Sequence, residues 1–177
     1  MLFRSLTFTE ADLAERYHEL SPKGQVDLVV IGCPQASVGE ARTTAAAVRA
    51  RMELGEKIPD QRLWVFMSGH NHDLIAADGT LGVLEEAGAL VLRDTCPEVT
   101  PYNRLHYNHL LTNSLKAEHY LTSGLNRMPT SVAPIDQCVA HAFDPMLIGG
   151  ERPVLGARAA KPMASAKSHR SGEHESS

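Results

Sequence analysis

The chain has 177 residues, of which 43% are hydrophobic and 21% are charged, and its formal net charge is −4 at neutral pH. This size and composition are typical of one globular domain with a substantial core. The acidic balance and the lack of a basic stripe disfavour nucleic acid and anionic membrane surfaces as partners. No run approaches the ~20 apolar residues of a bilayer-spanning helix. The first residues show no secretory signal pattern, so we expect a cytoplasmic protein with reduced thiols.

The N-terminal half of the sequence alternates helical patterns with short buried strands. Acidic residues crowd the start of the first helix, where the helix dipole favours them, and Thr9 supplies a cap. Ser37 and Glu40 form a capping-box pattern at the second helix, and Gly55 closes that helix. Unbroken apolar runs are typical of strands buried on both faces. The expected elements are a helix over 9–20, a strand over 28–31, a helix over 38–54 and a strand over 62–68.

The second half continues the alternation after a polar run, Ser68 to Asp73, that is predicted to be a loop. The elements expected after it are a helix over 80–87, a strand over 89–92, a strand ending near 111, and helices over 115–121 and 135–143. Strands that alternate with helices predict an α/β fold with a mainly parallel sheet. We expect this domain over residues 1–148. The composition then loses periodicity, which predicts a disordered tail over 149–177.

The chain has only three cysteines, and each lies beside a predicted loop. Cys33 and Cys96 directly follow predicted strands and precede proline, and the carboxyl ends of parallel strands meet at one edge of a sheet, where ligands bind. Cys138 opens a predicted helix that follows another loop, so we expect that it can approach the same edge of the sheet. Cys-Pro also recurs at iron–sulfur ligands. The alternative is that each cysteine is a small buried hydrophobe.

Four motifs in one order carry a family resemblance: G-C-P-Q-A-S, D-T-C-P-E-V, T-N-S-L-K-A-E-H-Y and D-Q-C-V-A-H-A. Over residues 26–143 the chain resembles the C-terminal part of the large, catalytic subunit of aconitase X, a family that contains cis-3-hydroxy-L-proline dehydratases and phosphomevalonate dehydratases. The resemblance implies a three-layer α/β/α aconitase-like domain. It also implies that Cys33, Cys96 and Cys138 bind an iron–sulfur cluster of the 2Fe-2S or 4Fe-4S type. Gln35 departs from the family, in which His more often follows Cys-Pro.

Three thiolate ligands have a chemical logic for a cubane cluster. They leave one iron open to act as a Lewis acid on a substrate hydroxyl, whereas four would close the cluster. A structural zinc site is the competitor, and it would need a fourth ligand such as His70 or His72. The C-x₂₋₄-C spacing that is common in such zinc sites is absent from this chain.

A second constellation follows the strand that ends near residue 111. Asn113 and Ser114 precede a helix, whose N-terminus favours an anion, and Lys116 is a natural counterion for a substrate carboxylate or phosphate. We therefore assign Ser114 and Lys116 as catalytic residues that place the substrate. In the alternative interpretation Ser114 only caps the helix and Lys116 is a solvated side chain.

These features predict an iron–sulfur hydro-lyase that removes water from a small hydroxy acid such as cis-3-hydroxy-L-proline or a phosphorylated hydroxy acid. The resemblance implies a general-base serine on a separate swivelling domain, carried by a small subunit, and an N-terminal part of the large subunit, so that the chain alone is expected to be inactive. One rival is a non-catalytic α/β binding or regulatory module with buried cysteines. Another is a hydrolase that uses Cys33 as a nucleophile with His70 or His72.

Overall fold

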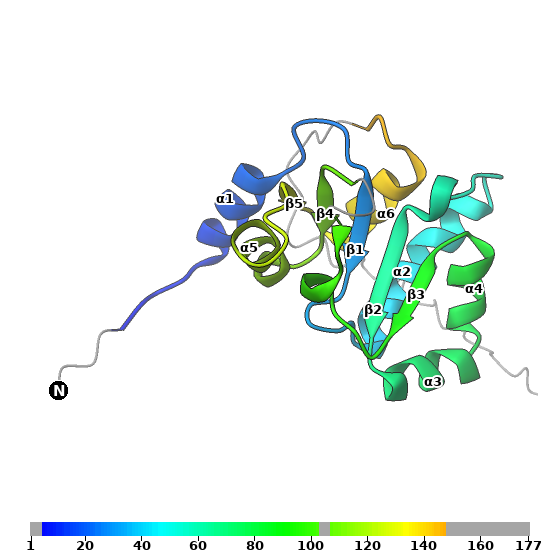
Figure 1. Cartoon of the computed structure of the whole chain (residues 1–177). Helices are drawn as coiled ribbons and strands as arrows, with labels where there is room; N and C mark the ends of the chain where they lie inside the picture. The colour runs from blue at the N-terminus through cyan, green and yellow to red at the C-terminus, as the bar shows by residue number, and fades with distance from the viewer. Residues whose placement is uncertain (1–4, 103–106, 148–177) are drawn as a thin grey trace, which may run out of the picture.

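The computed structural model describes residues 5–102 and 107–147. The predicted tail over 149–177 lies outside these residues. The elements in chain order, labelled in Figure 1, are α1 (Glu10–Leu20), β1 (Leu28–Ile31), α2 (Val38–Met52), the 3₁₀ turn η1 (Pro59–Gln61), β2 (Leu63–Met67), α3 (Gly69–Ala77), α4 (Thr80–Glu86), β3 (Leu90–Arg93), the 3₁₀ turn η2 (Pro97–Val99), β4 (Leu110–Thr112), α5 (Leu115–Ser123), β5 (Thr130–Val132) and α6 (Ile135–Phe143). No helix among the described residues is long and apolar enough to cross a membrane.

The strands form one five-stranded sheet in the order β3-β2-β1-β4-β5, and every neighbouring pair is parallel. The chain therefore builds outward from β1 through β2 to β3, then returns to add β4 and β5 on the other side of β1. In sheets of this kind the crevice at the carboxyl ends of the two strands where the order reverses is the usual place for a ligand. Here that switch point lies between β1 and β4.

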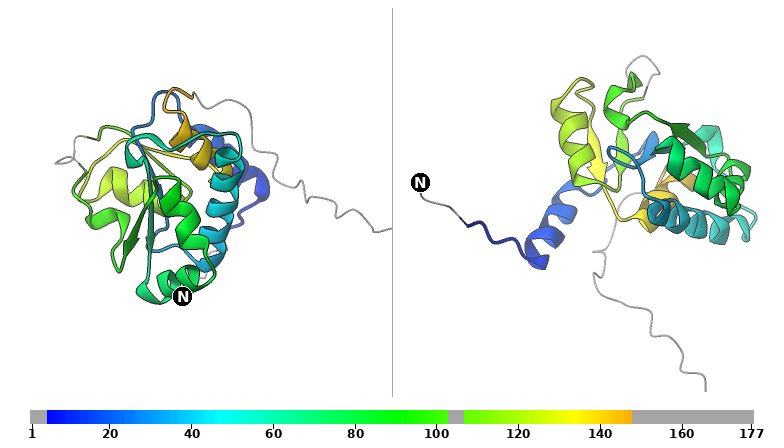
Figure 2. Two further views of the ribbon diagram at one scale, coloured as in Figure 1. Left: turned by 90° about the vertical axis from the view of Figure 1, so that its right-hand side faces the viewer. Right: turned by 90° about the horizontal axis from the view of Figure 1, so that it is seen from below.

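Helices cover both faces of the sheet, which confirms the predicted three-layer α/β/α fold. The larger core cluster joins one sheet face to α2, α3, α4 and α6, and the smaller cluster joins the other face to α5 and the aromatic residues near η2. Figure 2 shows α5 on one side of the sheet and α2 with α6 on the other. All residues of β1 and β2 are buried, as their apolar runs predict.

The turn after β1 needs a residue without a side chain. Gly32 has a φ of +96°, and a Cβ at this position would collide with the Phe66 carbonyl oxygen and lie 2.5 Å from the Ala36 backbone nitrogen. Directly after the turn, the Ala36 N–H donates to the Phe66 carbonyl at 2.6 Å. The backbone that leaves β1 thus packs directly against the end of β2, and this contact determines where Cys33 lies relative to the two strands.

Most predicted helix boundaries are confirmed, including the cap at Thr9 and the capping box of Ser37 with Glu40. The structure adds a capping box between Thr9 and Asp12. The loop predicted from Ser68 to Asp73 is wrong, because α3 begins at Gly69 with Ser68 as its N-cap. The helix has a weak apolar pattern, and its first backbone N–H is bound by Asp94, which is distant in sequence. The short strand β5 was not predicted, since its residues, Thr130 to Val132, include only one strongly apolar side chain.

The amino edge of the sheet holds a buried histidine at the end of α6. His141 is 2% exposed, and its Nδ1 has no hydrogen-bond partner among the described residues. Burial lowers the pKa of His141; nearby Asp144 opposes this effect, whereas Arg62 and His109 add to it. The folded protein therefore holds His141 in its neutral form at neutral pH.

The Gly32→Ala substitution is expected to destabilise the domain by about 2–4 kcal/mol, because it adds both a left-handed backbone penalty and an overpacked contact. Gly82→Ala is the matched control, since Gly82 lies within α4 with no atom near the added methyl group. We expect it to raise stability by roughly 0.5–1 kcal/mol through helix propensity. Urea denaturation followed by circular dichroism measures both, and equal stability of the two variants would contradict the account of the turn.

The His141→Gln substitution is expected to weaken the pH dependence of stability on the acid side. The folded-state pKa of His141 lies below its unfolded value, so the unfolded chain binds more protons and stability falls as the pH drops below about 6.5. Urea midpoints measured between pH 7.5 and 5.5 should fall less steeply for His141→Gln than for wild type. The control is His119→Gln, on exposed α5 surface, and a wild-type slope in the His141 variant would contradict the prediction.

Candidate functional site

The candidate site lies at the switch point between β1 and β4. Cys33 follows β1, and Ser114 follows β4 as the N-cap of α5, where its hydroxyl oxygen accepts from the Ala117 N–H at 3.2 Å. The Ser114 hydroxyl is also within hydrogen-bonding reach of the Cys33 thiol, and the Lys116 ammonium acts on that thiol electrostatically. Two strand ends that are distant in sequence thus bring a thiol, a hydroxyl and a cation together.

Cys96 joins the same group from β3, the edge strand. It precedes η2, and its thiol lies close enough to Cys33 for a charge on one to affect the other. Cys33 and Cys96 are both free and partly buried, so a small ligand or ion can reach them. Both residues lie beyond the carboxyl ends of strands in one parallel sheet, and their meeting as one site stays a prediction.

The protonation state of Cys33 depends on opposing effects. Burial raises the pKa of the Cys33 thiol and is the largest effect, and the nearby Cys96 and Glu98 add to it. The Lys116 charge and the Ser114 hydroxyl oppose it by stabilising the thiolate. Because burial is the largest effect, the Cys33 thiol is protonated at neutral pH in the free protein. A metal ion that binds the sulfur displaces this proton, as at other metal–thiolate sites.

Aromatic side chains form the apolar floor beneath Cys33. Tyr102 is fully buried, and its ring centroid lies 6.1 Å from that of Trp64, which in turn lies 5.7 Å from that of Tyr107. Cys33 packs against this cluster. Tyr102 precedes β4 in an irregular stretch without hydrophobic periodicity, so its burial did not follow from the sequence pattern.

Hydrogen bonds of Glu98 link η2 to the residues that follow α5. One carboxylate oxygen accepts from the Leu125 N–H at 2.7 Å, and the Glu98 carbonyl accepts from the Asn126 amide at 2.6 Å. The second carboxylate oxygen is buried with no hydrogen-bond partner among the described residues. No local sequence pattern singles out Glu98, since its partners are 27 and 28 residues away.

A hydrogen-bond chain joins β1, β4 and α2 behind the site. The Gly32 N–H donates to Asn113 Oδ1 at 3.3 Å, and Asn113 Nδ2 donates to Glu40 Oε1 at 2.9 Å. The other Glu40 oxygen accepts from the backbone and hydroxyl of Ser37, both at 2.9 Å. Glu40 therefore both completes the capping box of α2 and orients the Asn113 side chain beside Gly32.

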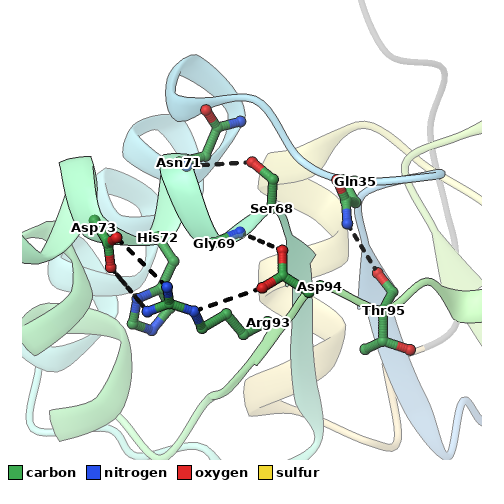
Figure 3. Close-up of polar contacts among 9 residues, drawn as sticks. All are labelled: Gln35, Ser68, Gly69, Asn71, His72, Asp73, Arg93, Asp94 and Thr95. Atoms are coloured by element: carbon green, nitrogen blue, oxygen red, sulfur yellow. Dashed lines mark hydrogen bonds and ion pairs between the residues drawn. The ribbon is translucent and has the colours of Figure 1, made fainter.

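A second set of contacts ties the ends of β1, β2 and β3 together (Figure 3). Gln35 Nε2 donates to the Thr95 carbonyl at 3.5 Å, and the Gly69 N–H donates to Asp94 Oδ1 at 2.6 Å. Arg93 Nη1 binds Asp73 Oδ1 at 2.8 Å and thereby links the end of β3 to α3. Gln35, which stands where the resembled family more often has His, thus has a structural contact.

Cys138 does not join the other two thiols. It is 0% exposed in the larger core cluster, on the sheet face opposite to the aromatic floor that Cys33 contacts, and its thiol donates to the Ala133 carbonyl at 3.2 Å. Its neighbours Val139, Ala142 and Phe143 share the buried side of α6. The expected site of three cysteines is therefore not formed in this structure, because the apolar stripe of α6 places Cys138 in the core.

The two histidines considered in the sequence have other surroundings than a metal or thiol partner. His70 is exposed, and His72 Nδ1 lies 3.5 Å from Arg93 Nη1 and 3.7 Å from Asp73 Oδ1. Within residues 5–102 and 107–147, no three His, Cys, Asp or Glu side chains come together as a metal-binding group. The described residues thus give no support to a four-ligand zinc site or to a Cys33–His pair.

Comparisons with known proteins show the family of the chain. The family model described as the aconitase X third domain matches residues 26–144. The phosphomevalonate dehydratase large subunit of Methanocaldococcus jannaschii is 34% identical over 113 residues, which cover 63% of this chain and 27% of that protein. The corresponding subunit of Methanothermobacter thermautotrophicus is 34% identical over 118 residues, covering 66% and 28%. That of Aeropyrum pernix is 30% identical over 137 residues, covering 77% and 33%.

One solved structure shares the fold. The crystal structure of Thermococcus kodakaraensis aconitase X in its holo-form superimposes with a TM-score of 0.63 at 23% sequence identity. The match covers 76% of this chain and 33% of that chain. The chain spans about a quarter to a third of the length of the relatives it matches.

The Lys116→Met substitution is expected to shift the alkylation of Cys33 to higher pH. Loss of the ammonium removes an effect that stabilises the thiolate, so the pKa of Cys33 rises further and the rate at a fixed pH falls. Iodoacetamide labelling, read for the Cys33 peptide by mass spectrometry over a range of pH, measures the shift. Lys57→Met is the control, on an exposed connection. An unchanged profile in the Lys116 variant would contradict the proximity of Lys116 and Cys33.

Proposed function

The chain belongs to the aconitase X family, and on that premise we propose that it forms the cofactor-holding part of a hydro-lyase that removes water from a small hydroxy acid. A phosphorylated hydroxy acid is the first choice of substrate, since three of its relatives are named phosphomevalonate dehydratase large subunits. A smaller hydroxy acid such as cis-3-hydroxy-L-proline is the second choice.

One observation carries the proposal: Cys33, Cys96 and Ser114 follow three strands of one parallel sheet at its carboxyl edge, and the charges of Cys96 and Lys116 act on the Cys33 thiol. Two soft sulfur ligands suit iron in a cluster, and an adjacent ammonium suits an anionic substrate. The arrangement also lies at the switch point of a parallel sheet. Three of the four motifs that carry the family resemblance thus contribute residues to the proposed site, at the ends of β1, β3 and β4.

The described residues fit an iron–sulfur cluster with two protein ligands. Cys33 and Cys96 would hold it, whereas Cys138 would have to leave the core and give up its hydrogen bond to Ala133 before it could bind iron. When bound, a cluster with an open iron supplies a Lewis acid for a departing hydroxyl group. A further ligand would therefore come from a part of the subunit other than the described residues.

The remaining residues of the site bind and orient. Lys116, which is exposed and has its Nζ 5.9 Å from the centroid of the Tyr120 ring, would pair with the substrate carboxylate or phosphate. Ser114 both caps α5 and can donate to the Cys33 sulfur, so its role is to hold that sulfur as well as to lie near the substrate. The buried rings of Trp64 and Tyr102 keep water away from the inner side of the site.

The proton acceptor is proposed to lie elsewhere. Dehydration requires a base that removes the proton α to a carboxylate, and we propose a serine on a swivelling domain of a small subunit for this role. The N-terminal part of the large subunit would be the second partner. The relatives are themselves called large subunits, which supports an assembly of this kind.

Anaerobic reconstitution with iron and sulfide tests the proposal. Wild type is expected to retain both elements and to show broad visible absorbance. Cys33→Ser and Cys96→Ser should each lower the iron content about ten-fold or more. Loss of a residue that only supports a metal ligand already lowers metal affinity by this order. Cys138→Ser is the matched control and should retain iron, because its thiol faces the core.

Two outcomes would contradict the proposal. A colourless wild-type protein without iron would favour the non-catalytic α/β module. Retention of iron by the Cys33 and Cys96 variants would mean that any bound metal lies away from the candidate site.

A further inference from the structure

The position of Cys96 requires an explanation, because its strand is not next to that of Cys33. Cys33 follows β1 and Cys96 follows β3, and β2 lies between them in the sheet. Adjacent strands are roughly 4.8 Å apart, so two neighbouring gaps separate the two strand ends. The chain that leaves β3 must therefore turn back across the end of β2 for the two thiols to meet.

Asp94 makes that turn. It has a φ of +55°, in the left-handed region that non-glycine residues seldom occupy and that Asp tolerates better than most. Its backbone N–H donates to the Met67 carbonyl at 2.9 Å, at the last residue of β2. The backbone therefore reverses direction at Asp94 while it is still bound to the neighbouring strand.

The side chain of Asp94 fixes the same turn from the other side. Its Oδ1 accepts from the Gly69 N–H, the first amide of α3, at 2.6 Å, and its Oδ2 lies 3.7 Å from Arg93 Nε (Figure 3). A Cβ at residue 69 would lie 2.8 Å from Asp94 Oδ2 and 2.9 Å from Arg93 Nη2. Gly69 thus leaves the space that the carboxylate needs.

The residue after Asp94 is bound to the turn that carries Cys33. The Thr95 carbonyl accepts from Gln35 Nε2, and Gln35 lies two residues after Cys33. The segment 94–96 is consequently bound to the ends of β1 and β2 as well as continuing from β3. Each of these contacts involves a residue no more than two positions from Cys33 or Cys96.

We propose that Asp94 is a positioning residue: by holding a left-handed turn against the end of β2 and the start of α3, it sets Cys96 opposite Cys33. This inference rests on the proposed function in that the two thiols act as one site. Asp94 itself does not need to touch a substrate or a cluster, and its effect is exerted through the direction in which the chain leaves β3.

Phenylarsine oxide is a direct probe of the arrangement, because its trivalent arsenic binds two thiols at once. Two As–S bonds form, two thiol protons leave with the oxygen as water, and no oxidation occurs. Wild-type protein should bind one equivalent that a dithiol releases and a monothiol does not. Cys33→Ser and Cys96→Ser should abolish this binding, and Cys138→Ser should leave it unchanged.

Asp94→Ala, which loses both the acceptor and the tolerance of the left-handed turn, should weaken arsenical binding about ten-fold or more, since chelation fails when two groups cannot reach one centre together. Asp94→Asn keeps an acceptor oxygen and should bind as wild type does. Asp94→Gly relieves the backbone strain but removes the acceptor, so its arsenical affinity should lie between those of Asp94→Ala and Asp94→Asn. It replaces Asp94→Ala in the test if that variant does not fold.

Asp78→Ala is the matched control, because Asp78 also accepts from a backbone N–H, that of Thr80 at 3.0 Å, and pairs with an arginine, Arg42 at 2.7 Å, but lies at the other end of α3. It should lose stability without losing the arsenical. Equal binding by Asp94→Ala, Asp94→Gly and wild type, or equal loss in the Asp78 and Asp94 variants, would overturn the positioning role while leaving the proposed function intact. Binding that survives Cys33→Ser and Cys96→Ser would instead contradict the two-thiol site itself.

Discussion

The close approach of the chain to β2 immediately after Gly32 is the constraint on which the rest of the site depends. Any side chain at residue 32 would strike the Phe66 carbonyl, and the Ala36 amide reaches that same carbonyl at 2.6 Å. Because β1 is the central strand, its carboxyl end also borders β4, where Asn113 receives the Gly32 amide at 3.3 Å. The position of Cys33 is therefore determined by two hydrogen bonds of the backbone around it, one to the Phe66 carbonyl in β2 and one to the Asn113 side chain just after β4.

The site is built from residues that serve structure and chemistry together. Ser114 caps α5 and can reach the Cys33 sulfur, and Glu40 caps α2 and holds the Asn113 amide. Such shared roles mean that substitutions at these positions change stability as well as ligand binding. They also explain how helix caps that are common in any α/β protein come to lie around the candidate site.

Much of the fold could be predicted from the sequence, because apolar runs and cap residues are local signals. The parallel sheet, the capping boxes and the bounds of α6 follow from such signals. The strand order could not be predicted, since nothing local says that β4 returns beside β1. The helix α3 was missed because its first amide is bound by Asp94, 25 residues away.

The predictions for the cysteines also depended on whether the signal was local in the sequence or came from distant contacts. The expectation that Cys33 and Cys96 converge follows from parallel strand ends, whereas the turn at Asp94 could not be predicted from the sequence. Cys138 was placed with them from its position after a loop and from the family resemblance. Its spacing with Ile135, Val139 and Ala142 is that of a helical apolar stripe, which was the available signal for burial.

The claim that is central to this account is that Cys33 and Cys96 lie together at one edge of the sheet, and electron paramagnetic resonance tests it most directly. Nitroxide labels would be attached to both thiols in a Cys138→Ser background, so that only these two sites carry spins. The account predicts a spectrum broadened by dipolar coupling relative to the sum of the two singly labelled proteins. A spectrum equal to that sum would contradict it.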